Sequence, residues 1–243
     1  MKFYQLMFSV VSMLGIATTT QANPNFQPDT VIEKPMYVFS APGFDDNDEM
    51  EVFLYGEFSN TCGQVGPIEF EINHEKKVIT LENKNYFYKG TACAQVINPY
   101  LKPKKLGMLK QGTYEIQIKT EKGKFQTMDT VHISKSLGPD KDDYTYAPVK
   151  SVEFEAGATP TITVKGVFPS DCMSMERVEV LQRKDQIIEV LPIVKFDENK
   201  SECLSKPTEF TEVADVKKAE KGKVLIHVRT MNGQSLSQVV DFN

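Results

Sequence analysis

The sequence predicts an all-β protein built from two tandem β-sandwich domains, each closed by one internal disulfide. Two observations carry this prediction: an internal repeat, and short segments in which apolar and polar residues alternate without a sustained helical period. The repeat has a constant offset of 110 residues with no insertion between its anchors, which indicates a duplicated module. The offset carries Cys62 onto Cys172, Cys93 onto Cys203, Gly56 onto Gly166, Phe58 onto Phe168, Gly112 onto Gly222 and Gly123 onto Gly233.

The beginning of the chain is typical of a secretory signal peptide. Lys2 opens a short basic end, an apolar run follows over 6–17, and Thr20-Gln21-Ala22 offers small residues for cleavage. We therefore expect a signal peptide over 1–22, a short leader over 23–34, and export to a periplasm or to the outside of the cell. No other apolar run approaches the length of a membrane span, so we expect no membrane insertion.

The four cysteines are expected to be oxidised in an exported chain, and four thiols allow three pairings. Only the bridges Cys62–Cys93 and Cys172–Cys203 give both modules the same internal link. A metal site or a reactive thiol is the alternative, but no Cys-x-x-Cys pair or nearby histidine accompanies these cysteines.

Superposing the two copies locates the strands, because matched positions alternate in the same way. Each copy has a turn that ends in glycine before its last strand, Glu121-Lys122-Gly123 or Met231-Asn232-Gly233, as expected for a hairpin. The matched apolar positions are Val52 and Leu54 with Ile162 and Val164; Ile68 and Phe70 with Val178 and Val180; 78–81 with 188–191; and Tyr114, Ile116 and Ile118 with Val224, Ile226 and Val228. Last strands are expected over 125–134 and 234–242, and opening strands over 36–40 and 152–155.

About seven short strands in each module is the count of an immunoglobulin-like sandwich. The predicted domains span 35–134 and 148–243, joined by a linker over 135–147 that is rich in Pro, Gly and charge. The cysteines fall in connections between strands, so each bridge should hold loops near one end of its sandwich. With the stretch Lys-Gln-Gly-Thr-Tyr at 110–114 and the pattern Gly-x-Phe-x-x-x-Cys, the chain resembles exported bacterial proteins with tandem immunoglobulin-like or fibronectin-III-like domains. That resemblance implies a fold and no activity.

The charge balance and the histidines argue against two classes of function. The chain has 28 basic and 33 acidic residues and no basic run, which disfavours nucleic acid as a partner. None of its three histidines lies beside a serine or cysteine in a recognised catalytic setting. His227 overlies Gln117 at an outward strand position, which indicates a surface residue. We therefore predict that the protein is not an enzyme.

An acidic cluster between the first two strands of module one is a candidate calcium site. Because that connection should lie at the end facing the linker, two segments rich in oxygen ligands would meet at the domain junction, and such ligands suit calcium. A solvated acidic turn is the alternative. The candidate ligands are Asp45, Asp46, Asp48 and Glu49 with Asp140, Asp142 and Asp143 of the linker.

Aromatic residues are more numerous in module one than in module two. If Val52 and Leu54 point inward, Phe53 and Tyr55 point outward, where module two has Thr163 and Lys165. Exposed apolar patches tend to mark contact surfaces, and tyrosine favours recognition. The alternative is that the leader, module two or a neighbouring strand covers these rings. The candidate contact residues are Phe53, Tyr55, Tyr86, Phe87 and Tyr88.

These observations favour a secreted or periplasmic binding protein that recognises a protein or a cell-envelope component through its first domain. A glycan partner is a further alternative, weakened by the absence of tryptophan. A second class is a structural or adhesive spacer stiffened by calcium, with no other cofactor expected. A pilus-type periplasmic chaperone and an enzyme inhibitor rank last.

Overall fold

A computed structural model describes residues 27–89, 92–138, 144–184, 186–217 and 221–242, so the predicted signal peptide lies outside the described residues. In these ranges the chain forms fifteen β-strands and one short 3-10 turn, which confirms the all-β prediction. None of the described segments is a helix long and apolar enough to cross a membrane.

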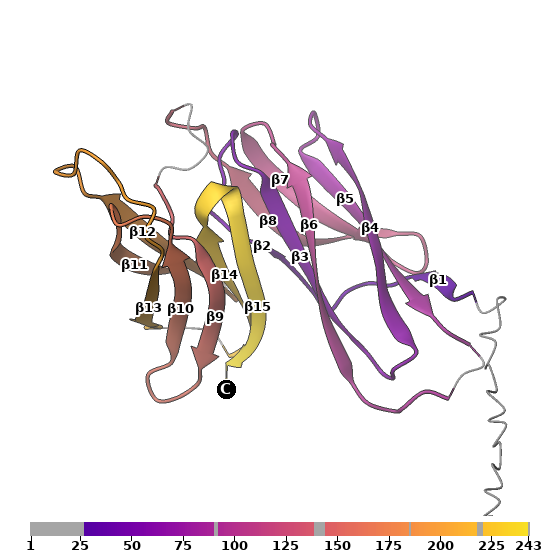
Figure 1. Cartoon of the computed structure of the whole chain (residues 1–243). Helices are drawn as coiled ribbons and strands as arrows, with labels where there is room; N and C mark the ends of the chain where they lie inside the picture. Colours follow the sequence, from indigo (N-terminus) through magenta and orange to yellow (C-terminus); the bar gives the residue numbers. More distant parts are fainter. Residues whose placement is uncertain (1–26, 90–91, 139–143, 185, 218–220, 243) are drawn as a thin grey trace, which may run out of the picture.

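The first half of the chain forms two sheets that face each other (Figure 1). One sheet has the order β2-β3-β6, and the other has the order β4-β5-β7-β8, with β1 paired to the second half of β5. The strands are β1 (Asp29–Ile32), β2 (Tyr37–Ser40), β3 (Met50–Phe58), β4 (Gly63–Asn73), β5 (Val78–Phe87), β6 (Asn98–Gly107), β7 (Gly112–Lys119) and β8 (Phe125–Ile133).

Apart from β1, the second half repeats this arrangement strand for strand, which confirms the duplication at the level of topology. Its sheets have the orders β9-β10-β13 and β11-β12-β14-β15. The strands are β9 (Val149–Glu155), β10 (Thr161–Phe168), β11 (Met173–Lys184), β12 (Ile187–Phe196), β13 (Thr208–Asp215), β14 (Gly222–Thr230) and β15 (Gln234–Phe242), with the turn η1 (Met231–Gly233) between the last two.

The strand order does not confirm an immunoglobulin-like topology. In an immunoglobulin domain the third strand lies next to the sixth. We count the strands of each sandwich from β2 and from β9, without β1. Here the fourth strand takes that place in both halves, and it pairs in parallel: β5 with β7, and β12 with β14. The third strands β4 and β11 are left at the sheet edge. Strand count alone cannot distinguish the two orders, because both use seven strands in two layers.

Each half has its own hydrophobic core between its two sheets, made by most of the matched apolar positions; the prediction is wrong for Phe70, which is 39 % exposed. Val52 and Leu54 are fully buried in the first half, as are Ile162 and Val164 in the second. The alternation along β3 and β10 therefore points inward as predicted. Each half is a β-sandwich in its own right.

The constant offset is wrong at one hairpin. Val78 pairs with Glu115, and its structural equivalent Ile187 pairs with Leu225, so β12 is offset from β5 by 109 residues. The hairpin between β11 and β12 is one residue shorter, and the offset returns to 110 at β13. Because side chains alternate along a strand, this shift places Ile79 and Ile188 in the cores and turns Glu189 outward.

The sixth strand of the chain, β6, and its counterpart β13 were not predicted. β6 contains Pro99 and Pro103, and proline disfavours a strand that must donate hydrogen bonds on both sides. β6 lies at the edge of its sheet, where only one side needs a partner. A repeated glycine marks this pairing: a Cβ at Gly56 would lie 2.3 Å from the hydroxyl oxygen of Tyr100, and one at Gly166 would lie 2.5 Å from the ring of Phe210.

Both predicted disulfides are present. Cys62 is bridged to Cys93 with a Cα–Cα distance of 5.5 Å, and Cys172 to Cys203 with 5.4 Å. In each half the two cysteines lie in two of the connections that cross between the sheets, after β3 and β5 or after β10 and β12. The bridges therefore link loops at one end of each sandwich, as predicted.

The end of the predicted leader is an ordered part of the first sandwich. It forms β1, which pairs with β5 beyond the point where β7 stops. The end of the predicted linker has the same role in the second half, where Tyr146 bridges to Ile193 of β12 and both side chains are buried. The predicted linker boundary at 147 is therefore later than the point where the chain joins the second sandwich.

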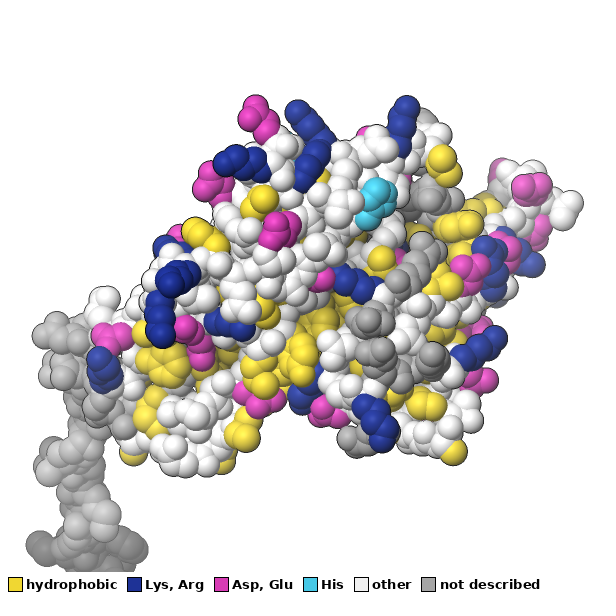
Figure 2. Space-filling view, turned by 180° about the vertical axis from the view of Figure 1, so that it is seen from behind, with side chains coloured by type: hydrophobic (Ala, Val, Ile, Leu, Met, Phe, Trp, Pro, Cys, Tyr) yellow, Lys and Arg dark blue, Asp and Glu magenta, His cyan; other side chains and the backbone are white. Residues whose placement is uncertain are grey.

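The two sandwiches pack face to face (Figure 1). The outer face of the β2-β3-β6 sheet contacts the outer face of the β11-β12-β14-β15 sheet, and Figure 2 shows hydrophobic side chains gathered where the two lobes meet. The molecule therefore consists of four stacked sheets, with a third apolar cluster between the second and third layers.

Candidate functional site

The interface between the sandwiches contains the aromatic residues that were predicted to bind a partner. Phe53 and Tyr55 point away from their own core, as predicted, but they are only 2 % and 5 % exposed. The second sandwich covers them: together with Phe39 they form one buried cluster with Ile187 and Leu225. The prediction that Phe53 and Tyr55 form a free contact surface is wrong, because their partner is the other half of the same chain.

The equivalent face of the second sandwich is open, which explains the difference between the copies. Thr163 and Lys165 occupy the positions of Phe53 and Tyr55 on β10, and Lys165 pairs with Glu153 at an exposed site. No further sandwich follows in this direction among the described residues, so polar side chains suit this face.

Two lysines of the second half reach across the interface to the first. Lys184 Nζ forms an ion pair with Asp129 and donates hydrogen bonds to Ser40 Oγ at 3.0 Å and to the carbonyl of Thr130 at 2.8 Å. At another edge, Lys223 Nζ lies 5.2 Å from the ring centroid of Tyr55. Across the interface, Lys184 thus contributes an ion pair and Lys223 a cation–π contact.

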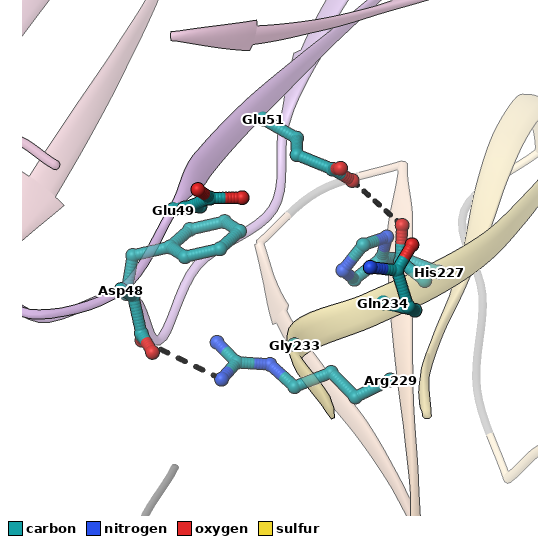
Figure 3. A pocket seen from close by; sticks show the side chains of 9 residues that line it. Asp48, Glu49, Glu51, His227, Arg229, Gly233 and Gln234 are labelled. Atoms are coloured by element: carbon teal, nitrogen blue, oxygen red, sulfur yellow. Dashed lines mark hydrogen bonds and ion pairs between the residues drawn. The ribbon is translucent and has the colours of Figure 1, made fainter. Parts of the chain in front are cut away.

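Between the sandwiches lies a small polar pocket of about 30 Å³ (Figure 3). Its main cation is Arg229 of β14, which lies 3.6 Å from Asp48 and donates from Nη2 to the carbonyl of Gly43 at 2.8 Å. Arg229 Nε also pairs with Glu189 at 3.1 Å. The guanidinium thus joins a carboxylate of each half, and its central carbon lies 4.9 Å from the ring centroid of Phe44. The volume admits only about one to three water molecules.

His227 is buried in this interface and not at the surface, so its surface prediction is wrong. It is 2 % exposed, its ring meets Phe53 edge-on at 5.6 Å between centroids, and Nδ1 lies 2.9 Å from Ser237 Oγ. Burial, with a smaller effect of the Arg229 charge, lowers the pKa of His227 to about 3. The imidazole is therefore neutral at physiological pH. It points outward from its own sandwich, as its alternation predicts, but into the other one.

The acidic cluster lies at the junction between the halves, as predicted. Its carboxylates have protein partners: Asp46 accepts from the backbone N–H of Ser136 at 2.8 Å, which lowers the pKa of Asp46. Asp45 accepts from the backbone of Asn47, and Asp48 pairs with Arg229. Glu49 lies 3.5 Å from Lys105. Among the residues described, no three or more His, Cys, Asp or Glu side chains are placed together to hold a metal ion.

The calcium prediction also involves the linker carboxylates. Asp140, Asp142 and Asp143 lie outside the described residues. The calcium site stays a prediction, and the cation that the structure places beside Asp48 is a guanidinium.

The remaining aromatic candidates lie at the disulfide end of the first sandwich. Phe87 is part of the packing, with its ring edge-on to Phe58 at 5.7 Å. Tyr86 and Tyr88 are half-buried on either side of it, and Tyr88 donates its backbone N–H to the carbonyl of Cys62. With the corrected offset, Lys195 and Asp197 occupy their places in the second half.

The sequence contained a signal for this interface that the prediction did not use. Leu225 and Val239 are paired at outward positions of β14 and β15, where the first half pairs Glu115 with Thr130. Both copies thus have apolar residues on an outer face: Phe53 and Tyr55 in the first half, and Leu225 and Val239 in the second. Arg229 gives a weaker signal, because its counterpart Lys119 is also basic.

One comparison with known proteins found a similarity. Residues 52–127 match the model of the ORF11 beta-sandwich domain, which covers the first half from β3 to the start of β8 and less than a third of the chain. No curated protein and no solved structure matches the chain. The match agrees with a β-sandwich fold in the first half.

Proposed function

We propose that this protein is an exported, non-enzymatic structural unit that holds two β-sandwiches in one fixed orientation, as a spacer or adhesive scaffold. The observation that carries the proposal is the burial of Phe39, Phe53 and Tyr55 against Ile187 and Leu225. Domains joined by small polar interfaces move relative to each other, whereas a hydrophobic interface restrains them.

The charges around the cluster support a single orientation. Lys184 binds Asp129 at one place, and Arg229 binds Asp48 at another, so two separate ion pairs fix rotation about the apolar contact. Both also contact backbone carbonyls of the first half, at Thr130 and Gly43, and backbone atoms cannot adjust as side chains can. From the sequence, we considered a spacer stiffened by calcium. In this proposal, contacts between the two sandwiches provide the stiffness.

The settings of the histidines support a role other than catalysis. His74 Nδ1 lies 3.1 Å from the hydroxyl of Tyr114, and His132 Nδ1 lies 3.0 Å from Thr113 Oγ1. His227 is neutral and buried in the interface. The two disulfides support export, because disulfides persist in a periplasm or outside the cell.

Distance measurements between the halves test the proposal. Spin labels at the exposed positions Thr127 and Ser151 would report the separation of β8 from β9 in the full chain. A fixed orientation predicts one narrow distance distribution that is unchanged by calcium or by a chelator. A broad distribution, or one that narrows only with calcium, would reject a unit held by protein contacts.

A second candidate is binding of a protein or cell-envelope component at the disulfide end of the first sandwich. Val96 and Ile97, in the connection that holds Cys93, are 52 % and 70 % exposed, and Tyr86 and Tyr88 are half-buried at the same end. The second half has Lys206 and Pro207 in place of Val96 and Ile97. Capture of envelope components by the wild type, but not by an Ile97→Asp variant with the same melting temperature, would support this candidate; equal capture would reject it.

A further inference from the structure

The first sandwich contains a buried amino group between its sheets, at the end occupied by β1. Lys102 of β6 is 6 % exposed, and Nζ lies 2.5 Å from Asn83 Oδ1, 3.2 Å from Asn85 Oδ1 and 2.9 Å from the carbonyl oxygen of Lys84. Asn83 and Asn85, both on β5, are fully buried. An amine and two carboxamides are thus held in contact away from water.

A carboxylate completes this group. Glu33, the residue after β1, accepts a hydrogen bond at Oε2 from Asn85 Nδ2 at 2.7 Å. Its backbone carbonyl accepts from Asn83 Nδ2 at 2.9 Å, and its N–H donates to the carbonyl of Asn83 at 3.0 Å. The hydroxyl of Tyr100 lies 3.3 Å and 3.4 Å from the two amide nitrogens. The end of the leader therefore carries an acid–base group into the sandwich.

The second sandwich has nothing comparable at the equivalent positions. By register, Pro192 and Val194 stand in place of Asn83 and Asn85, Glu212 in place of Lys102, and Phe210 in place of Tyr100. Since both copies fold into the same sandwich, the fold does not require this group. A buried polar cluster is costly unless every member is satisfied, which makes its presence in one copy informative.

The surroundings make the amine of Lys102 available as a nucleophile. Burial lowers the pKa of Lys102 to about 8, against the opposing effect of the Glu33 charge. About a tenth of the side chains are then uncharged at pH 7. A neutral amine held against a carbonyl in a dry site has the high effective concentration that speeds reactions within a molecule.

We infer that Lys102 and Asn85 form an intramolecular isopeptide bond, with Glu33 carrying the proton. The Nζ atom of Lys102 attacks Cγ of Asn85, the new N–C bond forms, and the bond from Cγ to Nδ2 breaks. One hydrogen of Nζ passes by way of Glu33 to Nδ2, which leaves as ammonia. The reaction exchanges one amide for another and needs no oxidant, reductant or further reactant.

We assign Asn85, and not Asn83, as the side chain that Lys102 attacks, because the contacts of the two leaving nitrogens differ. The side-chain carboxylate of Glu33 contacts Nδ2 of Asn85, whereas Nδ2 of Asn83 contacts only the backbone carbonyl of Glu33 and the hydroxyl of Tyr100. The bond would join β5 to β6 and therefore link the two sheets of the first sandwich covalently. It would lie at the same end as the Cys62–Cys93 bridge.

Peptide mapping of the full wild-type chain tests the inference. After reduction and alkylation, trypsin should release residues 85–89 joined to 90–104 as one branched peptide, lighter than the two peptides together by one ammonia. Asn83 lies in a different tryptic peptide, 78–84, so fragmentation distinguishes the two acceptors. Unlinked 85–89 and 90–104 from folded protein, or a link to 78–84, would overturn the assignment.

Two variants test the roles of the groups. Lys102→Met removes the amine and should yield only unlinked peptides, and Lys165→Met on the second sandwich should leave the link intact. Glu33→Gln keeps the shape of the side chain but cannot carry the proton, so the linked fraction should fall at least tenfold after short expression. A Glu33→Gln chain that links as fast as wild type would overturn the role of Glu33.

Discussion

Arg229 of β14 and Asp48, in the connection before β3, form an ion pair at 3.6 Å across the interface, with both side chains about nine-tenths buried. Removing one partner of a buried pair leaves the other charge without compensation, which costs about 3–5 kcal/mol. We therefore expect Arg229→Met to lower the free energy of unfolding by about that amount, measured by urea denaturation.

The first half offers a matched control for Arg229. Its counterpart Lys119 pairs with Glu82 on the outer face of the first sandwich, where the two side chains are 31 % and 20 % exposed. Surface pairs contribute about 0–1 kcal/mol, so Lys119→Met should have a small effect. Equal losses in the two variants would contradict the special role given to the interface.

Replacement of Asp48 tests whether the partner of this carboxylate is the Arg229 guanidinium or a calcium ion. Asp48→Asn should lower the melting temperature to the same extent with calcium and with a chelator, because the structure pairs this carboxylate with Arg229. Thermal melts of both proteins in both buffers are the measurement. If calcium raises the melting temperature of the wild type but not of the variant, Asp48 serves as a metal ligand.

The burial of His227 predicts a loss of stability in mild acid. The pKa of His227 is about 3 in the folded state and about 6.5 in the unfolded state. Between these values the unfolded chain binds a proton at His227 and the folded chain does not. The associated stability is complete above pH 6.5 and falls as the pH drops toward 3. At pH 5 the loss is about 2 kcal/mol.

Replacing His227 by glutamine isolates this effect from the carboxylates that line the same pocket. Gln117 is its counterpart in the first half, and glutamine does not titrate. The difference in unfolding free energy between wild type and His227→Gln should therefore change by about 2 kcal/mol from pH 7 to pH 5, measured in urea. A difference independent of pH would show that the imidazole is not buried as a neutral group.

The two disulfides close loops of the same length, with a sequence separation of 31 in each. The chain-entropy model gives each about 3–4 kcal/mol. In urea denaturation, the double variant Cys172→Ser with Cys203→Ser should lose that amount. The double variant Cys62→Ser with Cys93→Ser should lose less, because the inferred isopeptide bond already constrains the loop that holds Cys93.

The core of each sandwich could be predicted from the sequence because it depends on local alternation. The inward positions of Val52 and Leu54, and of Ile162 and Val164, follow from a period of two. The disulfides followed from the duplication. Which strands become neighbours depends on contacts between distant segments, so the parallel pairing of β5 with β7 could not be predicted from a strand count.

The site was half predictable. Alternation correctly placed Phe53, Tyr55 and His227 on outer faces, but a strand pattern does not show whether a second sandwich covers that face. Leu225 and Val239, paired outward where the first half has Glu115 and Thr130, carried the missing information. Lys102 could not be found by pattern, because β6 contains two prolines and its lysines are typical of an exposed edge.

Small-angle scattering of the wild type and of a variant carrying both Phe53→Thr and Tyr55→Lys tests the fixed orientation most directly. These are the residues of the second half at the same positions, so each sandwich should remain folded while the interface loses its aromatic cluster. We predict wild-type scattering that one compact particle fits, and a larger radius of gyration for the variant. Identical radii, or wild-type scattering that only a mixture of orientations fits, would contradict a rigid unit.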